Sequence, residues 1–359
     1  LPVAHVLARL VMHLVLSGAG VLGFSPNIKN LLPDIQAFKP SVLLVVPRVL
    51  EKVYNAASAK AGGGIKGKMF AWSAKQARTY ALAQERTFGP SLLKKARHGI
   101  ADALVLKKIR SILGPNLRYI VSGGAPLATD LAQFYSGMGI TLLQGYGLSE
   151  TTGPIAVQHV GKNPVGTVGL PLPGNFIKIA KDGEILVKGV SVMPGYYHLP
   201  DQTHQVMPDG EWFHTGDLGS ISKSGQLSIT GRKKELIVTA GGKNVSPEVL
   251  EDSLATHPLI ANVIVVGDQR PFIGALFTLD AEMLPDWLRK HGLPRCSPLE
   301  AAQLPEVQAS LQRAVDRANK AVSRAESIRR YRIVNAAFTV ENGYMTPSLK
   351  LKRRRVLAD

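Results

Sequence analysis

Short apolar runs that end in Gly or Pro alternate with longer segments of helical character in the first half of the 359-residue chain. The runs are "SVLLVVP" (41–47), "LRYIVSGG" (117–124) and "ITLLQGYG" (140–147). Each predicts a buried parallel strand, because a strand covered on both faces is apolar throughout its length. The stretch 49–113, between the first two runs, predicts helices with one break at "AGGGIKGK". This half of the chain therefore predicts strands alternating with helices.

The first 24 residues, "LPVAHVLARLVMHLVLSGAGVLGF", are mostly apolar. His5, Arg9 and His13 interrupt the run, whereas a membrane-spanning helix needs about 20 largely apolar residues without central charges. The segment also lacks the order of a signal peptide, and the first residue is not methionine. We therefore expect a buried helix here, in a chain whose true beginning lies upstream.

The pattern changes at about residue 164, where Pro and Gly become frequent up to residue 195. The segment "FIKIAKDGEILVKG" (176–189) predicts a β-hairpin around Asp182-Gly183, because Asp-Gly suits a tight primed turn. These features predict a small, mainly β subdomain at about 164–233.

The remaining segment, 234–359, predicts a second domain. Ser246 and Pro247 mark a helix start, as N-cap and first-turn residues. Two strands and one long amphipathic helix are then expected at 262–268, 272–280 and 306–331.

Composition narrows the class of protein. Hydrophobic residues make up 45% of the chain and charged residues 19%, which is typical of a globular protein. Cys296 is the single cysteine, so no intrachain disulfide can form, which suits a reducing cytoplasm.

The formal net charge of +17 favours an anionic partner. Twelve Lys or Arg residues lie between Lys66 and Arg118, against Glu85 and Asp102 alone. Nucleic acid is disfavoured, because the stretch has few aromatic residues and no recognisable nucleic-acid-binding module. A peripheral contact with an anionic membrane stays open.

The segment "GGGIKGK" (62–68) matches the start of a phosphate-binding P-loop. Met69 follows it, where the motif needs a Mg²⁺-binding hydroxyl, and the preceding segment is helical, whereas a P-loop follows a strand. We therefore interpret it as a flexible loop.

Two Gly-rich segments follow predicted strands and are better candidates for a ligand site. In "SGGAPL" (122–127) the glycines allow the backbone to approach a flat ligand closely. In "QGYGLSETT" (144–152), Tyr146 offers an aromatic face and Glu150 a hard oxygen ligand of the kind Mg²⁺ prefers. Hydroxyls stand at 149, 151 and 152. An ordinary polar turn is the alternative for each segment.

Two further segments carry polar groups suited to a nucleotide. In "WFHTGDLG" (212–219), Asp217 could accept both ribose hydroxyls from a Gly-flanked turn. In "GRKKELIVTAGGKN" (231–244), Arg232 could meet ribose or phosphate. Ordinary turn chemistry is again the alternative.

Taken in order, these four segments and "MTPSLK" (345–350) resemble the adenylate-forming, or acyl-activating, superfamily. The segments "PRVLEKVY", "VGLPLPG" and "EILVKGVSVMPGYY" are similar to bacterial long-chain fatty-acid–CoA ligases. The resemblance implies an α/β fold, in which 1–233 is the later part of a large adenylation domain with parallel-sheet layers and a small β subdomain. It implies a smaller, mobile α+β C-terminal domain at 234–359.

The reaction implied by this resemblance has two steps. A long-chain fatty acid attacks ATP to give acyl-AMP and pyrophosphate, and coenzyme A then attacks to give the thioester. Glu150 would hold Mg²⁺, Thr151 would touch phosphate, and Asp217 would bind the ribose hydroxyls. The ATP- and AMP-binding residues implied are Gly123, Gly124, Ala125, Gly145, Tyr146, Gly147, Thr151, Asp217 and Arg232.

Lys350 is the catalytic residue implied by the resemblance. It would contact the charge that develops between the carboxylate and the α-phosphate. Leu349 stands where members of the family usually carry glycine. The basic residues that follow, 352–355, are interpreted as a solvated tail.

Lys234 would be the hinge about which the small domain rotates, by the same resemblance. One orientation would present Lys350 for adenylation, and the other would present the coenzyme A side, with Gly241, Gly242 and Lys243, for thioester formation.

A Ser/Thr/Gly-rich loop that wraps the ATP phosphates is expected upstream of Leu1. Two alternatives therefore stay open beside the CoA ligase: a fatty-acyl-AMP ligase that feeds a carrier protein, and a truncated nucleotide-binding remnant without turnover. Acyl chain length and oligomeric state are not indicated by the sequence.

Overall fold

The computed structural model describes residues 3–25, 30–62, 64–161, 163–336, 338–346 and 351–358. The fold is α/β, as predicted. The chain groups into two compact units. The first comprises Leu1–Leu50, Gly64–Thr215 and Gly219–Ile229, and the second comprises Glu51–Gly63, Gly216–Leu218 and Thr230–Asp359.

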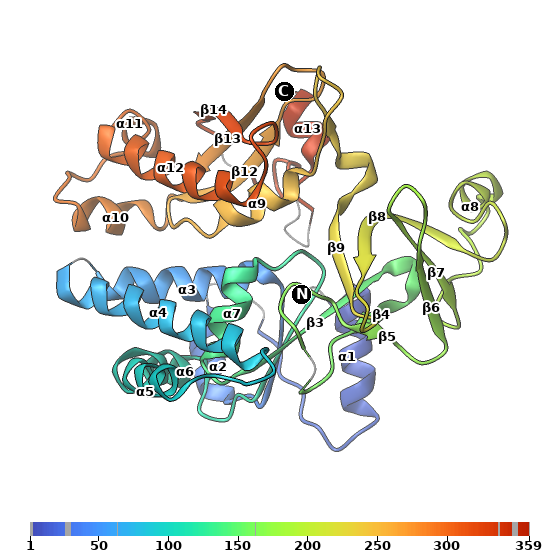
Figure 1. Ribbon diagram of the computed structural model, residues 1–359, viewed down its shortest axis with the longest axis horizontal. Coiled ribbons are helices and arrows are strands. Elements are labelled where there is room, and N and C mark those ends of the chain that lie inside the picture. Colours follow the sequence, from blue (N-terminus) through green and yellow to red (C-terminus); the bar gives the residue numbers. More distant parts are fainter. Residues whose placement is uncertain are drawn as a thin grey trace. The chain divides into compact units, whose positions relative to one another are not determined.

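A five-stranded sheet in the order β1-β2-β3-β4-β5 forms the centre of the first unit (Figure 1). Its strands are β1 (Val42–Val45), β2 (Tyr119–Ser122), β3 (Thr141–Leu148), β4 (Gly153–Val157) and β5 (Leu170–Pro171). β1, β2 and β3 are parallel, with Leu43 beside Ile120 and Ile120 beside Leu142. The three predicted parallel strands are therefore confirmed.

Helices pack beside this sheet. They are α2 (Leu31–Phe38), α3 (Pro47–Ala61), α4 (Gly64–Gln84), α5 (Leu92–Ala101), a π-helical turn (Asp102–Leu106), α6 (Lys107–Leu113) and α7 (Thr129–Gly137). α3 begins in the first unit and ends in the second. α4 and α7 pack closely at Gly137, where a Cβ atom would lie 2.0 Å from the carbonyl oxygen of Ala77. The hydroxyl of Tyr135 donates to the carbonyl of Leu50 at 2.8 Å and fixes α7 to the start of α3.

Two expectations for this unit are wrong. α1 (Val6–Leu16) has no buried residue, because it meets the sheet along one edge only, where Leu7 and Leu10 reach Gly123 and Gly153. The segment 62–68 was expected to be a flexible loop, but it is helical from Gly64, where α4 begins. The element before it is a helix, so the reason for rejecting a P-loop holds.

A four-stranded sheet in the order β6-β7-β8-β9 follows. Its strands are β6 (Asn175–Ile179), β7 (Glu184–Gly189), β8 (Phe213–Ile221) and β9 (Leu227–Arg232), with α8 (Pro200–Val206) before β8. The predicted hairpin is confirmed: β6 and β7 are antiparallel, and Gly183 in the turn has φ 88°. Buried Ile185, Val187 and Phe213 form its core together with Ile155 of β4.

The second unit has a three-stranded sheet and a short hairpin. Its elements are β10 (Ile237–Val238), β11 (Asn244–Val245), α9 (Pro247–Ala255), β12 (Ile260–Val266), β13 (Ile273–Leu279), α10 (Leu284–Lys290), α11 (Pro298–Ala301), α12 (Pro305–Ala318), β14 (Ile328–Ile333) and α13 (Arg353–Ala358). β13 pairs antiparallel with β12 and parallel with β14. Leu250, Phe277 and Leu311 are fully buried in one core with Leu288. The helix predicted to start at Pro247 and the two strands predicted next are confirmed.

The single long helix predicted at 306–331 is wrong. α12 ends at Ala318, and residues 328–333 form strand β14. The side chain of Asn319 ends the helix, because its amide bonds both to the carbonyl of Ile328, at 3.0 Å, and to the N–H of Ile328, at 2.8 Å. Ile328 is buried, and Tyr331 packs on Phe277 with ring centroids 5.0 Å apart.

Candidate active site

A glycine turn follows β2 in the first unit. Gly124 has φ 82°, a conformation that favours glycine. A Cβ atom on Gly123 would lie 3.2 Å from Leu7 of α1 and 3.4 Å from the carbonyl oxygen of Gly145 in β3. Gly123 therefore lies beside Gly145, which brings the first glycine turn next to the end of β3. Ala125 is exposed.

His5 also lies at this turn, a position that its place in the first apolar segment did not predict. Its ring atoms lie 3.9 Å from the position of a Cβ on Gly124. Its Nδ1 accepts the N–H of Leu7 at 3.2 Å and so caps α1. The cap fixes the ring beside the turn.

The next segment, Gly145, Tyr146 and Gly147, lies in the last part of β3. Gly147 cannot carry a side chain, because its Cβ would lie 1.9 Å from the carbonyl oxygen of Gly153. Tyr146 is half-buried and packs on the core around Ile155. The close approach of β3 and β4 thus explains the second glycine by packing, independently of any ligand.

Glu150 is held by a tyrosine from a distant part of the first unit. The hydroxyl of Tyr196 donates to Oε1 of Glu150 at 2.9 Å. Burial, followed by the hydrogen bond to Glu150, raises the pKa of Tyr196 to about 12, so the phenol remains a neutral donor near pH 7. The N–H of Met193 donates to the backbone carbonyl of Glu150 at 2.8 Å. The bond from Tyr196 fixes the direction of the carboxylate, and the bond from Met193 fixes the backbone of Glu150.

The carboxylate of Glu150 fits a Mg²⁺ ion that is also bound by the substrate. No group of three or more His, Cys, Asp or Glu that could hold a metal occurs among the described residues. Mg²⁺ is commonly bound by one or two carboxylates together with substrate phosphates and water. Glu150 could supply the one protein carboxylate of such a site.

The phosphate contact of Thr151 stays a prediction, and in this conformation its hydroxyl is bonded within its own turn. Thr151 is fully buried, and its Oγ1 accepts the N–H of Leu148 at 2.8 Å and donates to the carbonyl of Gly153 at 2.7 Å. Its hydroxyl therefore shapes the 3₁₀ turn Ser149–Thr151 in this conformation. Ser149, at the start of the same turn, is exposed and is the better placed hydroxyl.

Asp217 and Arg232 form an ion pair in the second unit. Nε of Arg232 lies 3.0 Å from Oδ1 of Asp217, with the Asp217 side chain 6% exposed and that of Arg232 49% exposed. The expected Gly-flanked turn is wrong, because Asp217 lies within strand β8. The pair presents a fixed carboxylate beside a half-exposed guanidinium.

Glu248 joins this pair from the first turn of α9. Burial, and next the nearby charge of Glu235, raise the pKa of Glu248 to about 7, while the charge of Arg232 lowers it. Its carboxylate lies near Gly231, where a Cβ would be 3.7 Å from Oε2. In the sequence, Glu248 was visible only as an acidic residue of the first helical turn.

The predicted hinge and coenzyme A residues follow within the second unit. Lys234 is exposed in the 3₁₀ turn Lys233–Glu235. Gly241, Gly242 and Lys243 form the tip of the β10–β11 hairpin, where Gly242 has φ 73° and its N–H donates to the carbonyl of Thr239 at 2.8 Å. Nζ of Lys243 lies 3.5 Å from Oε1 of Glu326.

Lys350 lies outside the described residues, so its predicted role is not addressed by the structure. The residues on either side of it are paired. Met345 forms a β-bridge with Leu351, and the N–H of Lys352 donates to the carbonyl of Tyr344 at 2.8 Å.

The solvated-tail interpretation is wrong for Arg353. Its side chain is only 17% exposed, and its Nη2 lies 2.5 Å from Oε1 of Glu251 in α9. Its Nη1 donates to the carbonyl of Val265 in β12 at 2.7 Å, and its Nε lies 3.7 Å from Oε2 of Glu235. Arg353 therefore ties the C-terminal segment to the core of the second unit, whereas Arg354 is exposed.

Comparison with known families gives two matches. The model of the AMP-binding enzyme family matches residues 1–197, and that of the AMP-binding enzyme C-terminal domain matches residues 234–359. The second match starts at Lys234, the residue expected to be the hinge.

Several known proteins are similar over nearly the whole chain. The long-chain-fatty-acid–CoA ligase FadD15 of Mycobacterium bovis is 48% identical over 357 residues, which cover 99% of this chain and 59% of FadD15. The human long-chain-fatty-acid–CoA ligase ACSBG1 is 32% identical over 387 residues, covering 99% of this chain and 53% of the relative. The chain thus spans little more than half the length of these relatives.

Solved structures share the fold. The adenylation domain of a carboxylate reductase from Mycobacterium chelonae has a TM-score of 0.70 at 22% identity, over 96% of this chain and 49% of that chain. O-succinylbenzoate coenzyme A synthetase from Bacillus subtilis, solved with ATP and magnesium ion, has a TM-score of 0.61 at 20% identity, over 100% of this chain and 60% of that chain.

Proposed function

This chain belongs to the AMP-binding enzyme family, and on that premise we propose that it takes part in the ATP-dependent activation of a long-chain fatty acid, first to acyl-AMP and then to acyl-CoA. The observation that carries the substrate class is the 48% identity to FadD15, whose name is long-chain-fatty-acid–CoA ligase, over 99% of the chain. ATP, Mg²⁺ and coenzyme A are the co-substrates and metal that this reaction requires.

In this proposal the first unit supplies contacts to the base, the phosphate and the metal. The backbone of Gly123, Gly124 and Ala125, beside Gly145, would lie against the adenine. Glu150, oriented by Tyr196, would hold Mg²⁺ together with phosphate oxygens. The exposed position of Ser149 favours it over Thr151 as the hydroxyl that meets phosphate.

The second unit would supply the sugar contacts and the catalytic charge. Asp217, ion-paired with Arg232 at 3.0 Å, would accept the ribose hydroxyls. Lys350 would stabilise the charge that develops as carboxylate attacks the α-phosphate. Rotation about Lys234 would exchange Lys350 for the hairpin carrying Gly241, Gly242 and Lys243 before coenzyme A attacks.

Two assays test the proposal. The chain is incubated with palmitate, ATP and Mg²⁺, and palmitoyl-AMP is measured; separately it is given synthetic palmitoyl-AMP and coenzyme A, and palmitoyl-CoA is measured. We expect Lys350→Ala to lower the first rate by about 10²–10³-fold and to leave the second within a few-fold. Equal activity of Lys350→Ala and the unchanged chain in the first assay would contradict the role of Lys350.

The same assays separate the alternatives. A fatty-acyl-AMP ligase would make palmitoyl-AMP but no palmitoyl-CoA, and would pass the acyl group to an added carrier protein. A nucleotide-binding remnant would bind AMP and form no product in either assay.

A cytoplasmic location with peripheral contact to an anionic membrane belongs to the same proposal. No helix of the described residues is long and apolar enough to cross a bilayer. A long-chain fatty acid partitions into bilayers, so contact with a membrane surface would bring the protein to its substrate.

A further inference from the structure

One face of the first unit combines exposed apolar and basic side chains that have no role in the proposed site. It comprises the loop before α5, α5 itself, the π-helical turn after it and the first residues of α6, and is called here the α5 face. Its members are Phe88, Leu92, Leu93, Ile100, Leu104, Arg86, Lys95, Arg97, Lys107 and Lys108. Phe88 is 99% exposed and Leu92 84%. Contiguous apolar exposure of this kind commonly marks an interaction site.

The way α5 is attached explains why these side chains face solvent. The His98 ring stacks on Tyr80 of α4 with centroids 4.0 Å apart, and its Nε2 lies 2.6 Å from the carbonyl oxygen of Gly137. Ala101 is fully buried on the same side of the helix. Leu93 and Ile100 are seven residues apart, two helical turns, and so share a different side of α5. In Figure 1, α4 and α5 run alongside each other.

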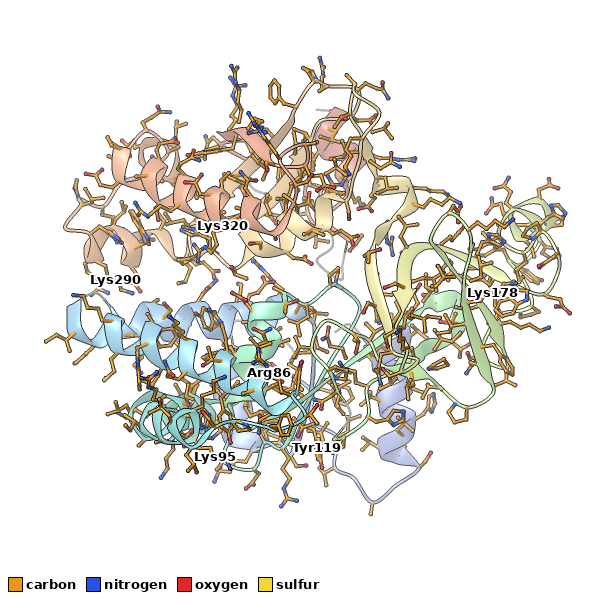
Figure 2. The ribbon with its side chains drawn as sticks, in the orientation of Figure 1. Arg86, Lys95, Tyr119, Lys178, Lys290 and Lys320 are labelled. Atoms are coloured by element: carbon orange, nitrogen blue, oxygen red, sulfur yellow. The ribbon has the colours of Figure 1, made fainter. Side chains whose placement is uncertain are left out.

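The charge of the α5 face is predominantly positive. The acidic residue of the loop before α5, Glu85, accepts the N–H of Val165 at 2.9 Å. No Asp or Glu occurs from Phe88 to Ala101, whereas Lys94, Lys95 and Arg97 do. The nearest acidic residue along α5, Asp102, is ion-paired with Arg110. Arg86, from the loop between α4 and α5, and Lys95, from α5, are labelled in Figure 2. The field of the face is therefore positive and attracts a surface rich in negative charge.

We propose that the α5 face docks on the surface of an anionic phospholipid bilayer. Phe88, Leu92 and Leu93 enter the headgroup region, while Lys95 and Arg97 bind lipid phosphates. A basic helix with exposed Leu and Phe lies in the interface of a membrane and does not span it, with apolar burial and attraction to anionic lipid adding together. Nucleic acid fits the face less well, because exposed leucines have no partner on a phosphate backbone and stacking on bases needs aromatic side chains. The inference depends on no step of acyl activation.

A fluorescent reporter tests apolar insertion directly. Phe88→Cys is made in a Cys296→Ser chain, which leaves one thiol, and is labelled with an environment-sensitive dye. Vesicles of phosphatidylcholine and phosphatidylglycerol in equal parts are then added. We expect the emission to shift to the blue. A chain labelled at Val190→Cys, an 85% exposed position of the same unit, should show no shift. Equal shifts at both positions, or no shift at Phe88→Cys, would overturn the proposal.

Vesicle co-sedimentation tests the charge. We expect the unchanged chain to bind the mixed vesicles and to bind pure phosphatidylcholine weakly. Lys95→Glu/Arg97→Glu/Lys108→Glu should lower partitioning by about 100-fold or more, given the contribution of each basic residue near an anionic leaflet. Leu92→Ser/Leu93→Ser should lower it at least about tenfold.

Matched changes elsewhere in the first unit serve as controls. Lys181→Glu/Lys223→Glu alters exposed basic residues of the β subdomain and should leave partitioning within a few-fold. Equal losses of partitioning in the control and in the α5-face variants would show that net charge alone determines binding, and would contradict the proposal. Tighter binding of the unchanged chain to duplex DNA or RNA than to the vesicles would contradict it as well.

Discussion

At the scale of single residues, the arrangement of Glu150 depends on contacts that sequence spacing does not reveal. Its hydrogen-bond partner Tyr196 is 46 positions away, in a segment that the sequence marked only by family resemblance. Thr151 shows the opposite case, since a hydroxyl beside a candidate metal ligand is buried in the backbone of its own turn. Residue types could be predicted from the motif, but which oxygen faces outward is decided by packing of β3 against β4.

The contact between Tyr196 and Glu150 predicts an effect on metal dependence. Tyr196→Phe removes the donor that orients the carboxylate, and changes of this kind beside a metal ligand cost about 10–100-fold in metal affinity or activity. We expect the Mg²⁺ concentration for half-maximal adenylation to rise about tenfold or more. Tyr197→Phe, at a neighbouring 87% exposed position, is the control and should leave it unchanged. Identical Mg²⁺ curves for the two variants would contradict this role of Tyr196.

Substitutions at Thr151 and Ser149 should have different effects, the first on stability and the second on the adenylation rate. Thr151→Val leaves the N–H of Leu148 and the carbonyl of Gly153 without their partner, so thermal unfolding should show a loss of about 1–3 kcal/mol. Ser149→Ala should leave stability within about 0.5 kcal/mol and lower the adenylation rate. The reverse pattern, with Thr151→Val stable and inactive, would restore Thr151 as the phosphate contact.

At the scale of elements, the apolar pattern predicted strands well and misplaced the end of one helix. β1, β2 and β3 were predictable as parallel strands from their apolar runs, but burial on both faces was not confirmed: in β1 only Val45 is buried. The residues after Ala318 continue the charged, amphipathic pattern of the helix and so predicted a longer one. The side-chain amide of Asn319 instead bonds to the backbone of Ile328 and ends the helix. The C-terminal basic run was misread for a similar reason, since the buried partners of Arg353 come from α9 and β12, about 90 to 100 positions earlier.

Arg353 should be essential to the stability of the second unit. Arg353→Met leaves Glu251 buried beside no cation, and breaking a buried ion pair on one side costs about 3 kcal/mol or more. Hydrogen exchange of peptides from α9 and β12 should accelerate about 100-fold. Arg354→Met, the exposed neighbour, is the control and should change exchange little. Equal exchange in both variants would contradict the anchoring role.

The first turn of α9 should make stability depend on pH. The pKa of Glu248 is about 7 in the folded chain and near 4.5 when unfolded, so the folded state binds the proton more tightly. The unfolding free energy should therefore fall as pH rises from about 4.5 to about 7. Glu248→Gln should flatten this fall and exceed the original stability at pH 8 by about 2 kcal/mol.

Two other carboxyl groups are needed to interpret this measurement, one as a second source of pH dependence and one as a control. Burial, followed by the charge of Glu248, also raises the pKa of Asp252, to about 8, so a smaller fall in the unfolding free energy from about pH 4 to pH 8 should persist in Glu248→Gln. Glu306→Gln, an exposed acidic residue at the start of α12, is the control and should keep the full slope. Urea titrations at several pH values measure all three chains; an unchanged slope in Glu248→Gln would contradict the assignment.

At the scale of the whole molecule, the residues proposed to bind ATP are distributed over both units. Gly123, Gly145 and Glu150 belong to the first, and Asp217 and Arg232 to the second. This set stays a prediction, which the sequence supports because each segment resembles a motif of the family. The sequence could not predict Tyr196, Glu248 or Arg353 as contributors, because their importance arises from contacts between segments far apart in the chain.

The central claim is that this chain carries the site for a fatty acyl-adenylate. Isothermal titration calorimetry with palmitoyl-sulfamoyl-adenosine, an uncleavable analogue of palmitoyl-AMP, tests it independently of turnover. The account predicts saturable binding of one analogue per chain, weakened by about tenfold or more in Asp217→Asn, which loses charged hydrogen bonds to the ribose. Asp316→Asn, an exposed change in the same unit, should bind as the unchanged chain does. Absence of binding, or equal binding in Asp217→Asn, would contradict the account.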